Sequence, residues 1–122
     1  MTVSRYFFDT SAWLGYFFEK SERVLSLVSG PNIILTSSLS LFEIKRKLLR
    51  DGTKEEMIVN IIDFIKMRSI LTNIEPALAL HAATLGHKHR LGALDALIYA
   101  SAQQESSLLV TRDFDFHNLP QV

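Results

Sequence analysis

The sequence predicts an α/β protein with three layers, in which helices cover both faces of a central parallel sheet of four to five strands. Short apolar runs alternate along the chain with longer segments of helical periodicity. Apolar strands separated by helical crossovers are typical of a parallel sheet that is buried on both faces. The length of 122 residues suits one domain, which we expect to span residues 1–122.

The predicted elements follow one another in the order β-αα-β-αα-β-αα-β. The strands are expected at residues 6–8, 33–35, 70–72 and 108–110, and only residues 119–122 remain for a fifth, edge strand. The helices are expected at about residues 12–18, 22–28, 38–50, 53–67, 76–89 and 93–104.

Polar residues and turn signals define the ends of these helices. Thr10 or Ser11 is expected to cap the first helix, and Ser38 or Ser40 the third. Thr53 with a glutamate three residues later forms a predicted capping box for the fourth helix.

Composition excludes several classes of protein. The chain has 48% hydrophobic and 21% charged residues, which rules out disorder, and its formal net charge is zero. It has no cysteine, which excludes a disulfide framework and thiolate metal sites and fits a reducing compartment. No apolar run approaches the ~18 residues of a membrane helix, and no signal peptide is expected. We therefore predict a cytoplasmic protein without a membrane partner.

Carboxylates gather where the predicted sheet would bind a ligand. Asp9 comes directly after the first strand, and Asp113 comes shortly after the fourth. Asp95 lies in the first turn of the helix that leads into the fourth strand. Ligands of open parallel sheets bind beyond the carboxyl ends of the strands. Glu43 lies in the helix that follows the second strand. Acids at one edge repel each other unless a cation is bound, and Mg²⁺ or Mn²⁺ prefers such oxygen ligands.

Each acid also has a purely structural interpretation. Asp9 is a good helix cap, and Asp95 is favoured in a first turn by the helix dipole. Asp113 could be a turn residue. Glu43 precedes Lys47 by four residues, which is the order of a surface ion pair on a helix. The joint placement of the acids at one edge favours a site over these separate roles.

Four segments of the sequence together resemble the PIN domain, in particular the small VapC-type toxins of prokaryotic toxin–antitoxin pairs. The segments are FFDTS at 7–11, SSLSLFE at 37–43, LGALDALIYA at 91–100 and LVTRDFDF at 109–116. The resemblance covers nearly the whole chain and implies a PIN-like fold.

The resemblance implies a ribonuclease that depends on Mg²⁺ or Mn²⁺, with one or two ions in each site. Its catalytic and metal-binding acids carry over to Asp9, Glu43, Asp95 and Asp113. The auxiliary residues that it implies are Ser11, Thr111 and Asp115. It also implies an RNA substrate and a cognate VapB-like antitoxin that blocks the acidic site.

Basic residues lie beside two of these acidic segments. Four of the six residues from 45 to 50 are Lys or Arg, and a second basic group precedes Asp95. Such groups bind phosphate backbones in a salt-dependent manner, although a solvated helix face has the same pattern. The candidate RNA-binding residues are Lys47, Arg50, Lys88 and Arg90.

Two predicted helices carry more apolar residues than one buried face needs. In residues 12–18 the apolar side chains go around nearly the whole helix, and residues 53–67 have the same excess. Either other helices cover both sides, or the excess marks interfaces. We expect a homodimer and an antitoxin segment bound in a groove, with Trp13, Tyr16 and Phe17 as aromatic anchors.

A second function stays open. A PIN-like module could bind RNA or protein without cleaving it. The presence of all four acids argues against this alternative.

Overall fold

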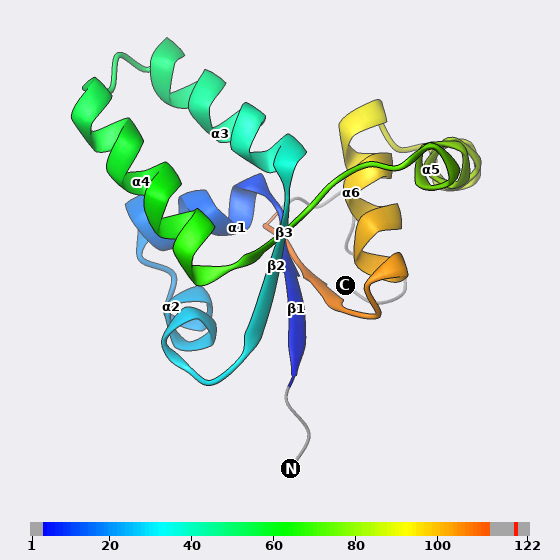
Figure 1. Cartoon of the computed structure of the whole chain (residues 1–122), viewed down its shortest axis with the longest axis horizontal. Helices are drawn as coiled ribbons and strands as arrows, with labels where there is room; N and C mark the ends of the chain where they lie inside the picture. The colour runs from blue at the N-terminus through cyan, green and yellow to red at the C-terminus, as the bar shows by residue number, and fades with distance from the viewer. Residues whose placement is uncertain (1–3, 113–118, 120–122) are drawn as a thin grey trace.

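The computed structural model describes residues 4–112 and 119, and it contains one sheet of four parallel strands in the order β3-β2-β1-β4. The strands are β1 (Arg5–Phe8), β2 (Ile33–Ser37), β3 (Ile70–Thr72) and β4 (Leu108–Val110). Figure 1 shows the sheet nearly edge-on, between the α3–α4 hairpin on one side and α5 and α6 on the other. The predicted parallel sheet is therefore confirmed.

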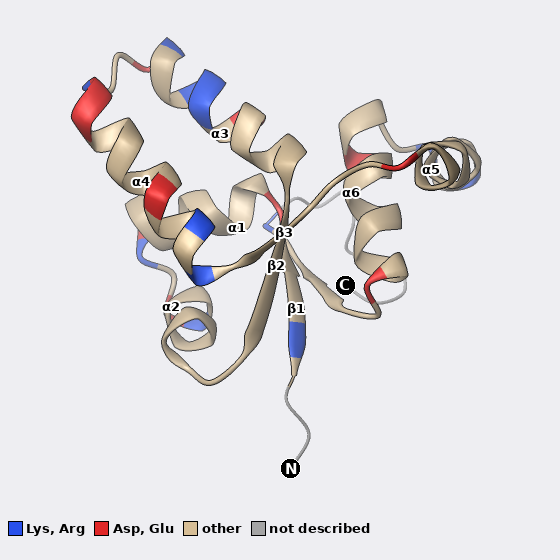
Figure 2. Cartoon of the chain, viewed as in Figure 1, with Lys and Arg blue, Asp and Glu red and all other residues tan. Residues whose placement is uncertain are grey.

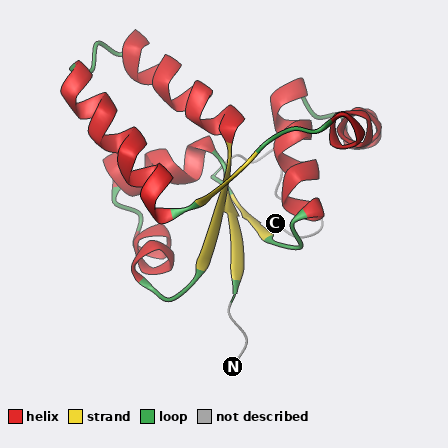
Figure 3. Cartoon of the chain, in the orientation of Figure 1, coloured by secondary structure: helices red, strands yellow, loops and turns green. Residues whose placement is uncertain are grey.

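Helices cover both faces of this sheet and form the outer layers (Figure 3). The α-helices are α1 (Thr10–Leu14), α2 (Glu22–Ser29), α3 (Ser38–Arg50), α4 (Glu55–Arg68), α5 (Pro76–His89) and α6 (Ala93–Gln104). A π-helical turn, η1 (Gly15–Glu19), continues α1. The helix predicted at residues 12–18 is thus a short α-helix that widens into a π-turn.

Successive residues of each strand point to opposite faces and build two cores. Phe8, Ile34 and Val110 pack with α1 to α4, whereas Phe7 and Leu109 pack with α5 and α6. This alternation is the period of two that a strand imposes on its side chains. Because both faces are covered, the strands are apolar on both sides, as the sequence pattern predicts.

Three predicted caps are wrong. Asp9, not Thr10 or Ser11, caps α1 and accepts from the Ala12 N–H, which confirms the interpretation of Asp9 as a helix cap. Ser37 takes the predicted place of Ser38 or Ser40 before α3. The helix α4 begins after Lys54 without a side-chain cap, so the predicted capping box does not form. Before α1 and α3, several adjacent residues are able to cap, and the direction of the chain after the strand selects one.

The strand order brings the first and last strands of the described sheet together. β2 and β3 add to one side of β1, and β4 pairs with its other side. The order therefore reverses between β1 and β4, which is where an open parallel sheet forms a binding crevice beyond its carboxyl ends. Of the predicted fifth strand, only Leu119 is described, and it packs against the core beside α5 and α6.

Candidate active site

Asp9 lies in the crevice between the carboxyl ends of β1 and β4 and is only 7% exposed. Its Oδ1 accepts from the Ala12 N–H at 2.8 Å and from Ser11 Oγ at 2.7 Å. Its Oδ2 accepts from the Thr111 hydroxyl across the crevice. A buried carboxylate needs such donors to remain charged, and here they come from both strand ends.

The two hydroxyls have a defined direction. Ser11 and Thr111 each carry one hydroxyl proton, and the contacts with Asp9 use both of them because a carboxylate only accepts. Their oxygens lie 3.3 Å apart. The Ser11 oxygen also accepts from the Arg112 main-chain N–H at 2.8 Å, which ties α1 to the end of β4. Predicted as auxiliary residues, Ser11 and Thr111 thus surround Asp9 and position its carboxylate.

Glu43 points from α3 toward α1. Its Oε1 accepts from the Thr10 hydroxyl at 2.9 Å, and Thr10 adjoins Asp9 in the chain. The side chain of Lys47 pairs with Asp51 at 3.2 Å. The structural interpretation of Glu43 as the partner of Lys47 is therefore wrong, and Glu43 belongs to the same edge of the sheet as Asp9.

Asp95 approaches this edge from the other face of the sheet. It lies half-buried in the first turn of α6, which Gly92 caps without a side-chain bond. Because α6 leads back into β4, it runs against the strands, and its first turn lies at their carboxyl ends. The positive end of the helix dipole stabilises a carboxylate there.

Asp113 and Asp115 lie outside the described residues. Within residues 4–112 and 119, no group of three His, Cys, Asp or Glu side chains is close enough to hold a metal ion. The donors that the crevice does hold are carboxylate and hydroxyl oxygens, which are the ligands that Mg²⁺ and Mn²⁺ prefer. The chemistry of these oxygen donors fits such a cation, but the described residues do not bring three acidic or histidine side chains together.

The candidate RNA-binding residues lie at the ends of two helices. Lys47 and Arg50 are in the last turn of α3, and Lys88 is in the last turn of α5, which Arg90 ends in a left-handed conformation with φ 56°. Figure 2 shows basic segments in the second half of α3. Arg50, Lys88 and Arg90 are exposed, whereas Lys47 is half-buried and paired.

Trp13 is buried completely and is not an anchor at the surface. Its exposed fraction is 0%, and its indole N–H donates to Thr36 Oγ1 at 3.1 Å. The prediction that Trp13 contacts a partner is wrong, because the ring points from α1 into the core above β2. Tyr16 and Phe17 stay half-exposed. They line a groove of about 500 Å³ between η1, α2 and α4, together with Lys20, Leu25, Met57, Asn60, Ile61 and Phe64.

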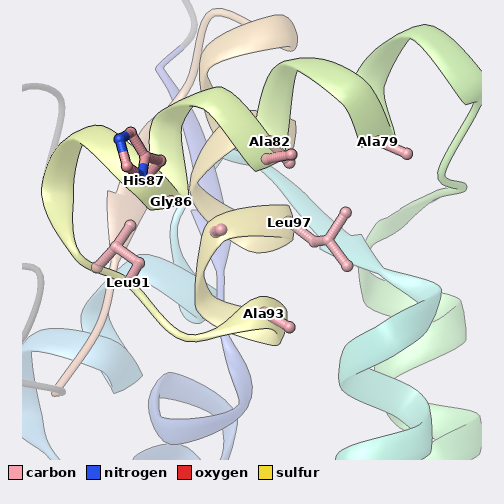
Figure 4. A pocket seen from close by; sticks show the side chains of 9 residues that line it. Ala79, Ala82, Gly86, His87, Leu91, Ala93 and Leu97 are labelled. Atoms are coloured by element: carbon pink, nitrogen blue, oxygen red, sulfur yellow. The ribbon is translucent and has the colours of Figure 1, made fainter.

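A separate hollow of about 400 Å³ lies between α5 and α6 (Figure 4). Small side chains line it, among them Ala79, Ala82 and Ala93, with His87 and Leu91 at one end. Among the described residues that line it there is no carboxylate. Its position and chemistry separate it from the acidic crevice.

Sequence reasoning missed two residues of the crevice. Thr10 was expected only as a cap, yet its hydroxyl orients Glu43. Arg112 joins the Ser11 network through its backbone, which no side-chain pattern could indicate. For Thr10, the available signal in the sequence is its position directly after Asp9, the acid at the end of β1.

A parallel α/β sheet with a buried carboxylate at its switch point defines a class of protein that binds its ligand beyond the strand ends. The PIN domain matches residues 6–122, and the chain belongs to this family. No curated protein sequence matches the chain. Among the described residues no helix is long and apolar enough to cross a membrane.

Solved structures share the fold at low identity. The chain is similar to a toxin–antitoxin complex from Klebsiella pneumoniae, with 23% identity, a TM-score of 0.76 and coverage of 95% of this chain and 93% of that one. It is also similar to VapC20 of Mycobacterium tuberculosis, a toxin that cleaves the sarcin–ricin loop, with 21% identity, a TM-score of 0.77 and coverage of 96% of each chain. A third neighbour is VapBC2 of Rickettsia felis bound to promoter DNA, with 21% identity, a TM-score of 0.77 and coverage of 97% of this chain and 95% of that one. The structural neighbours thus include VapC toxins of VapBC complexes.

Proposed function

We propose that the protein is an endoribonuclease that depends on Mg²⁺ or Mn²⁺ and acts as the toxin of a toxin–antitoxin pair. The observation that carries this proposal is the buried Asp9 carboxylate, held by Ser11 and Thr111 at the switch point of a PIN-domain sheet. Asp95 and Glu43 approach the same edge from the two faces of the sheet.

Asp9 and Asp95 would hold the cation, and Glu43 and Asp113 would complete the set of ligands. When bound, one or two such ions neutralise the phosphodiester, lower the pKa of a bound water and stabilise the leaving oxygen. Ser11 and Thr111 keep both Asp9 oxygens in fixed directions. Thr10 fixes one Glu43 oxygen and leaves the other to orient the attacking water or to bind a second ion.

RNA would approach across the ends of α3 and α5. Arg50, Lys88 and Arg90 are exposed and offer positive charge to the phosphate backbone. The Lys47–Asp51 pair reduces the charge that Lys47 contributes. We therefore assign Arg50 a larger share of RNA binding than Lys47.

An antitoxin segment is the proposed occupant of the groove beside Tyr16 and Phe17. Relatives of similar fold were crystallised as toxin–antitoxin complexes. The groove is mostly apolar; Met57, which lines it, is 48% exposed, and the neighbouring Phe18 is 46% exposed. An amphipathic helix fits such a surface. We also propose that the free protein is a homodimer, because apolar side chains of α3, α4 and α5 remain exposed.

Carboxylate substitution tests the nuclease. Asp9→Asn and Asp95→Asn should abolish cleavage of RNA in Mn²⁺ and leave the metal-free protein as stable as the parent or more stable, because like charges at the site are removed. Mg²⁺ should raise the Tm of the parent more than that of either variant. Asp63→Asn, on the exposed face of α4, is the control and should cleave normally.

The same cleavage assay also distinguishes a nuclease from the alternative function, a module that binds RNA without cleaving it. A parent that binds RNA but cleaves none in Mg²⁺ or Mn²⁺ would identify a binding module. An Asp95→Asn chain that unfolds without metal would make Asp95 a structural cap.

Salt dependence tests the RNA surface. Replacing Lys47 and Arg50 together by Gln should weaken RNA binding and flatten its dependence on salt, without changing the affinity for Mn²⁺. Replacing Arg23 on α2 and Lys66 in the last turn of α4 by Gln removes the same charge away from the end of α3 and should leave the slope closer to that of the parent. Equal slopes for both double variants would remove the end of α3 from the RNA surface.

A further inference from the structure

An apolar trough lies between the two helices of the α3–α4 hairpin, and we call it the α3–α4 trough. Two adjoining hollows of about 460 and 440 Å³ form it, and both are lined by Lys45, Leu49 and Ile62. Three apolar side chains that line it are exposed: Phe42 by 57%, Leu49 by 58% and Val59 by 48%. Apolar side chains that are exposed together in this way are typical of a protein interface.

The two walls of the trough carry opposite charges. Lys45 and Arg46 form a basic wall on α3, and Glu55 and Asp63 form an acidic wall on α4. Figure 2 shows the basic segments along α3 and the acidic segments along α4. All four side chains are exposed, and none of them forms an ion pair within residues 4–112 and 119. The trough thus offers unpaired charges of both signs around an apolar floor.

The trough is distinct from the groove that we assign to the antitoxin segment. Both surfaces use α4, but Met57 and Phe64 line the groove, whereas Val59 and Ile62 line the trough. The two surfaces therefore lie on different sides of α4 and can be occupied at the same time. RNA is a poor occupant of the trough, because the acidic wall would repel its phosphates.

The charge pattern favours a second copy of this chain as the occupant. A two-fold axis parallel to the trough places α3 of each copy against α4 of the other. The basic wall of each copy then faces the acidic wall of its partner, and every contact forms twice. An axis across the trough would instead place α3 against α3 and bring like charges together. The two walls thus select one of the two symmetric arrangements.

We propose that two copies of this chain associate through the α3–α4 trough, with the basic wall of each copy against the acidic wall of the other and with Leu49 buried in the contact. The apolar floor supplies the buried surface, and the charges fix the direction of association. This inference rests on the proposed function, because it gives the homodimer proposed there its surface.

Sedimentation of the full chain over a series of concentrations tests the charges. Lys45→Glu/Arg46→Glu places acid against acid and should raise the Kd of the dimer by at least about tenfold. Glu55→Lys/Asp63→Lys places base against base and should have the same effect. An equimolar mixture of the two variants should form a heterodimer about as tight as the parent dimer, since opposite charges face each other again on both sides of the axis. Damage to the fold would not be rescued by mixing.

Leu49→Gln tests the apolar floor. The contact buries this side chain once from each copy, so the variant should also raise the Kd of the dimer by at least about tenfold. Leu80→Gln is the matched control, because Leu80 is 74% exposed on α5, outside the trough. Lys88→Glu/Arg90→Glu is the control for the charges, since both residues are exposed at the end of α5. Both controls should dimerise as the parent does.

The inference is overturned if the parent is a dimer and the charge-reversed variants dimerise equally well, or if their mixture forms no heterodimer. A parent that stays monomeric at every concentration overturns the proposed homodimer together with this surface and leaves the trough to a different protein. Cleavage of RNA by the parent in Mn²⁺ is measured separately. A parent that cleaves keeps the proposed nuclease whatever its sedimentation shows.

Discussion

The two faces of the sheet are covered in opposite ways. On the α1–α4 face, aromatic rings separate the helices: Tyr16 stacks on Phe64 with centroids 5.3 Å apart, and Trp13 lies 4.9 Å from Phe8. On the α5–α6 face, small residues let the helices approach so closely that a Cβ at Gly86 would lie 2.9 Å from that of Ala96. Large rings leave an open groove at their edge, whereas small residues leave a shallow hollow.

This difference bears on the carboxyl edge of the sheet, because each face brings one acidic residue toward that edge. The α1–α4 face brings Glu43 to Thr10. The α5–α6 face brings Asp95, whose next residue, Ala96, makes the closest approach to Gly86. Glu43 and Asp95 thus approach the carboxyl edge of the sheet from opposite faces, one packed by aromatic rings and the other by close helix contact.

Removing Trp13 should have the largest effect on stability. Trp13→Ala deletes a fully buried ring that contacts Phe8, Tyr16, Phe17 and Phe64 and should cost about 3–5 kcal/mol. Urea unfolding measures the loss. Trp13→Phe keeps much of the ring volume, so it should cost clearly less. Equal costs would mean that the indole N–H, and not ring packing, holds this face together.

Adding one methyl group tests the other face. Gly86→Ala should destabilise the protein by about 1–3 kcal/mol, because the α5–α6 contact has no room for it. In an open helix the same change would stabilise by up to about 1 kcal/mol. Adding Ala96→Gly should restore part of the loss, and urea unfolding of the four forms gives the coupling. Additive costs would show that Gly86 and Ala96 do not limit the approach.

A substitution of Arg68 tests whether polar contacts, as well as aromatic rings, stabilise the α1–α4 face. Its guanidinium donates to the main-chain oxygens of Val28 at 2.9 Å and of Gly30 and Asn32 at 3.2 Å. Arg68→Met should cost about 1–2 kcal/mol in thermal or urea unfolding, since these carbonyls lose charge-assisted bonds. Lys66→Met, exposed on the same helix, should cost less. Similar costs would make the end of α4 independent of the α2–β2 turn.

Tyr99 gives the smallest effect, and only at alkaline pH. Burial on the α5–α6 face raises its pKa above the ordinary value of 10.0, with the Gln103 hydrogen bond opposing the shift. Below pH 10.0 the phenol is neutral in both states, so nothing is lost. As the pH rises above that value, the unfolded chain ionises first, and stability falls until the folded pKa is passed.

The measurement is the difference in unfolding free energy between the parent and Tyr99→Phe as a function of pH. The parent should lose stability faster than the variant above pH 10.0. Parallel curves would show that Tyr99 ionises equally in both states.

Local pattern was enough to place the elements and the acids along the chain. Apolar runs and helical periodicity predicted all four described strands. The apolar composition of β1, β2 and β4 follows from burial between two helix layers, whereas β3 is an apolar edge strand whose Ile70 is 55% exposed. The position of Asp9 after β1 and of Asp95 in a first turn follows from the same pattern. Caps were harder, since Asp9, Thr10 and Ser11 are all able to cap and only the path of the chain after β1 selects Asp9.

Chain order and side-chain chemistry by themselves determined the class of fold, the oxygen-rich acidic edge and the family to which the motifs belong. Tertiary structure decided which side chains meet. In the folded chain Trp13 is buried, Glu43 accepts a hydrogen bond from Thr10, and the Arg112 side chain lies against Gly15 and pairs with Glu19. Residues about 100 positions apart, such as Ser11 and Thr111, become neighbours only because β4 pairs with β1. Such contacts depend on strand order and on the direction of each side chain, neither of which local sequence encodes.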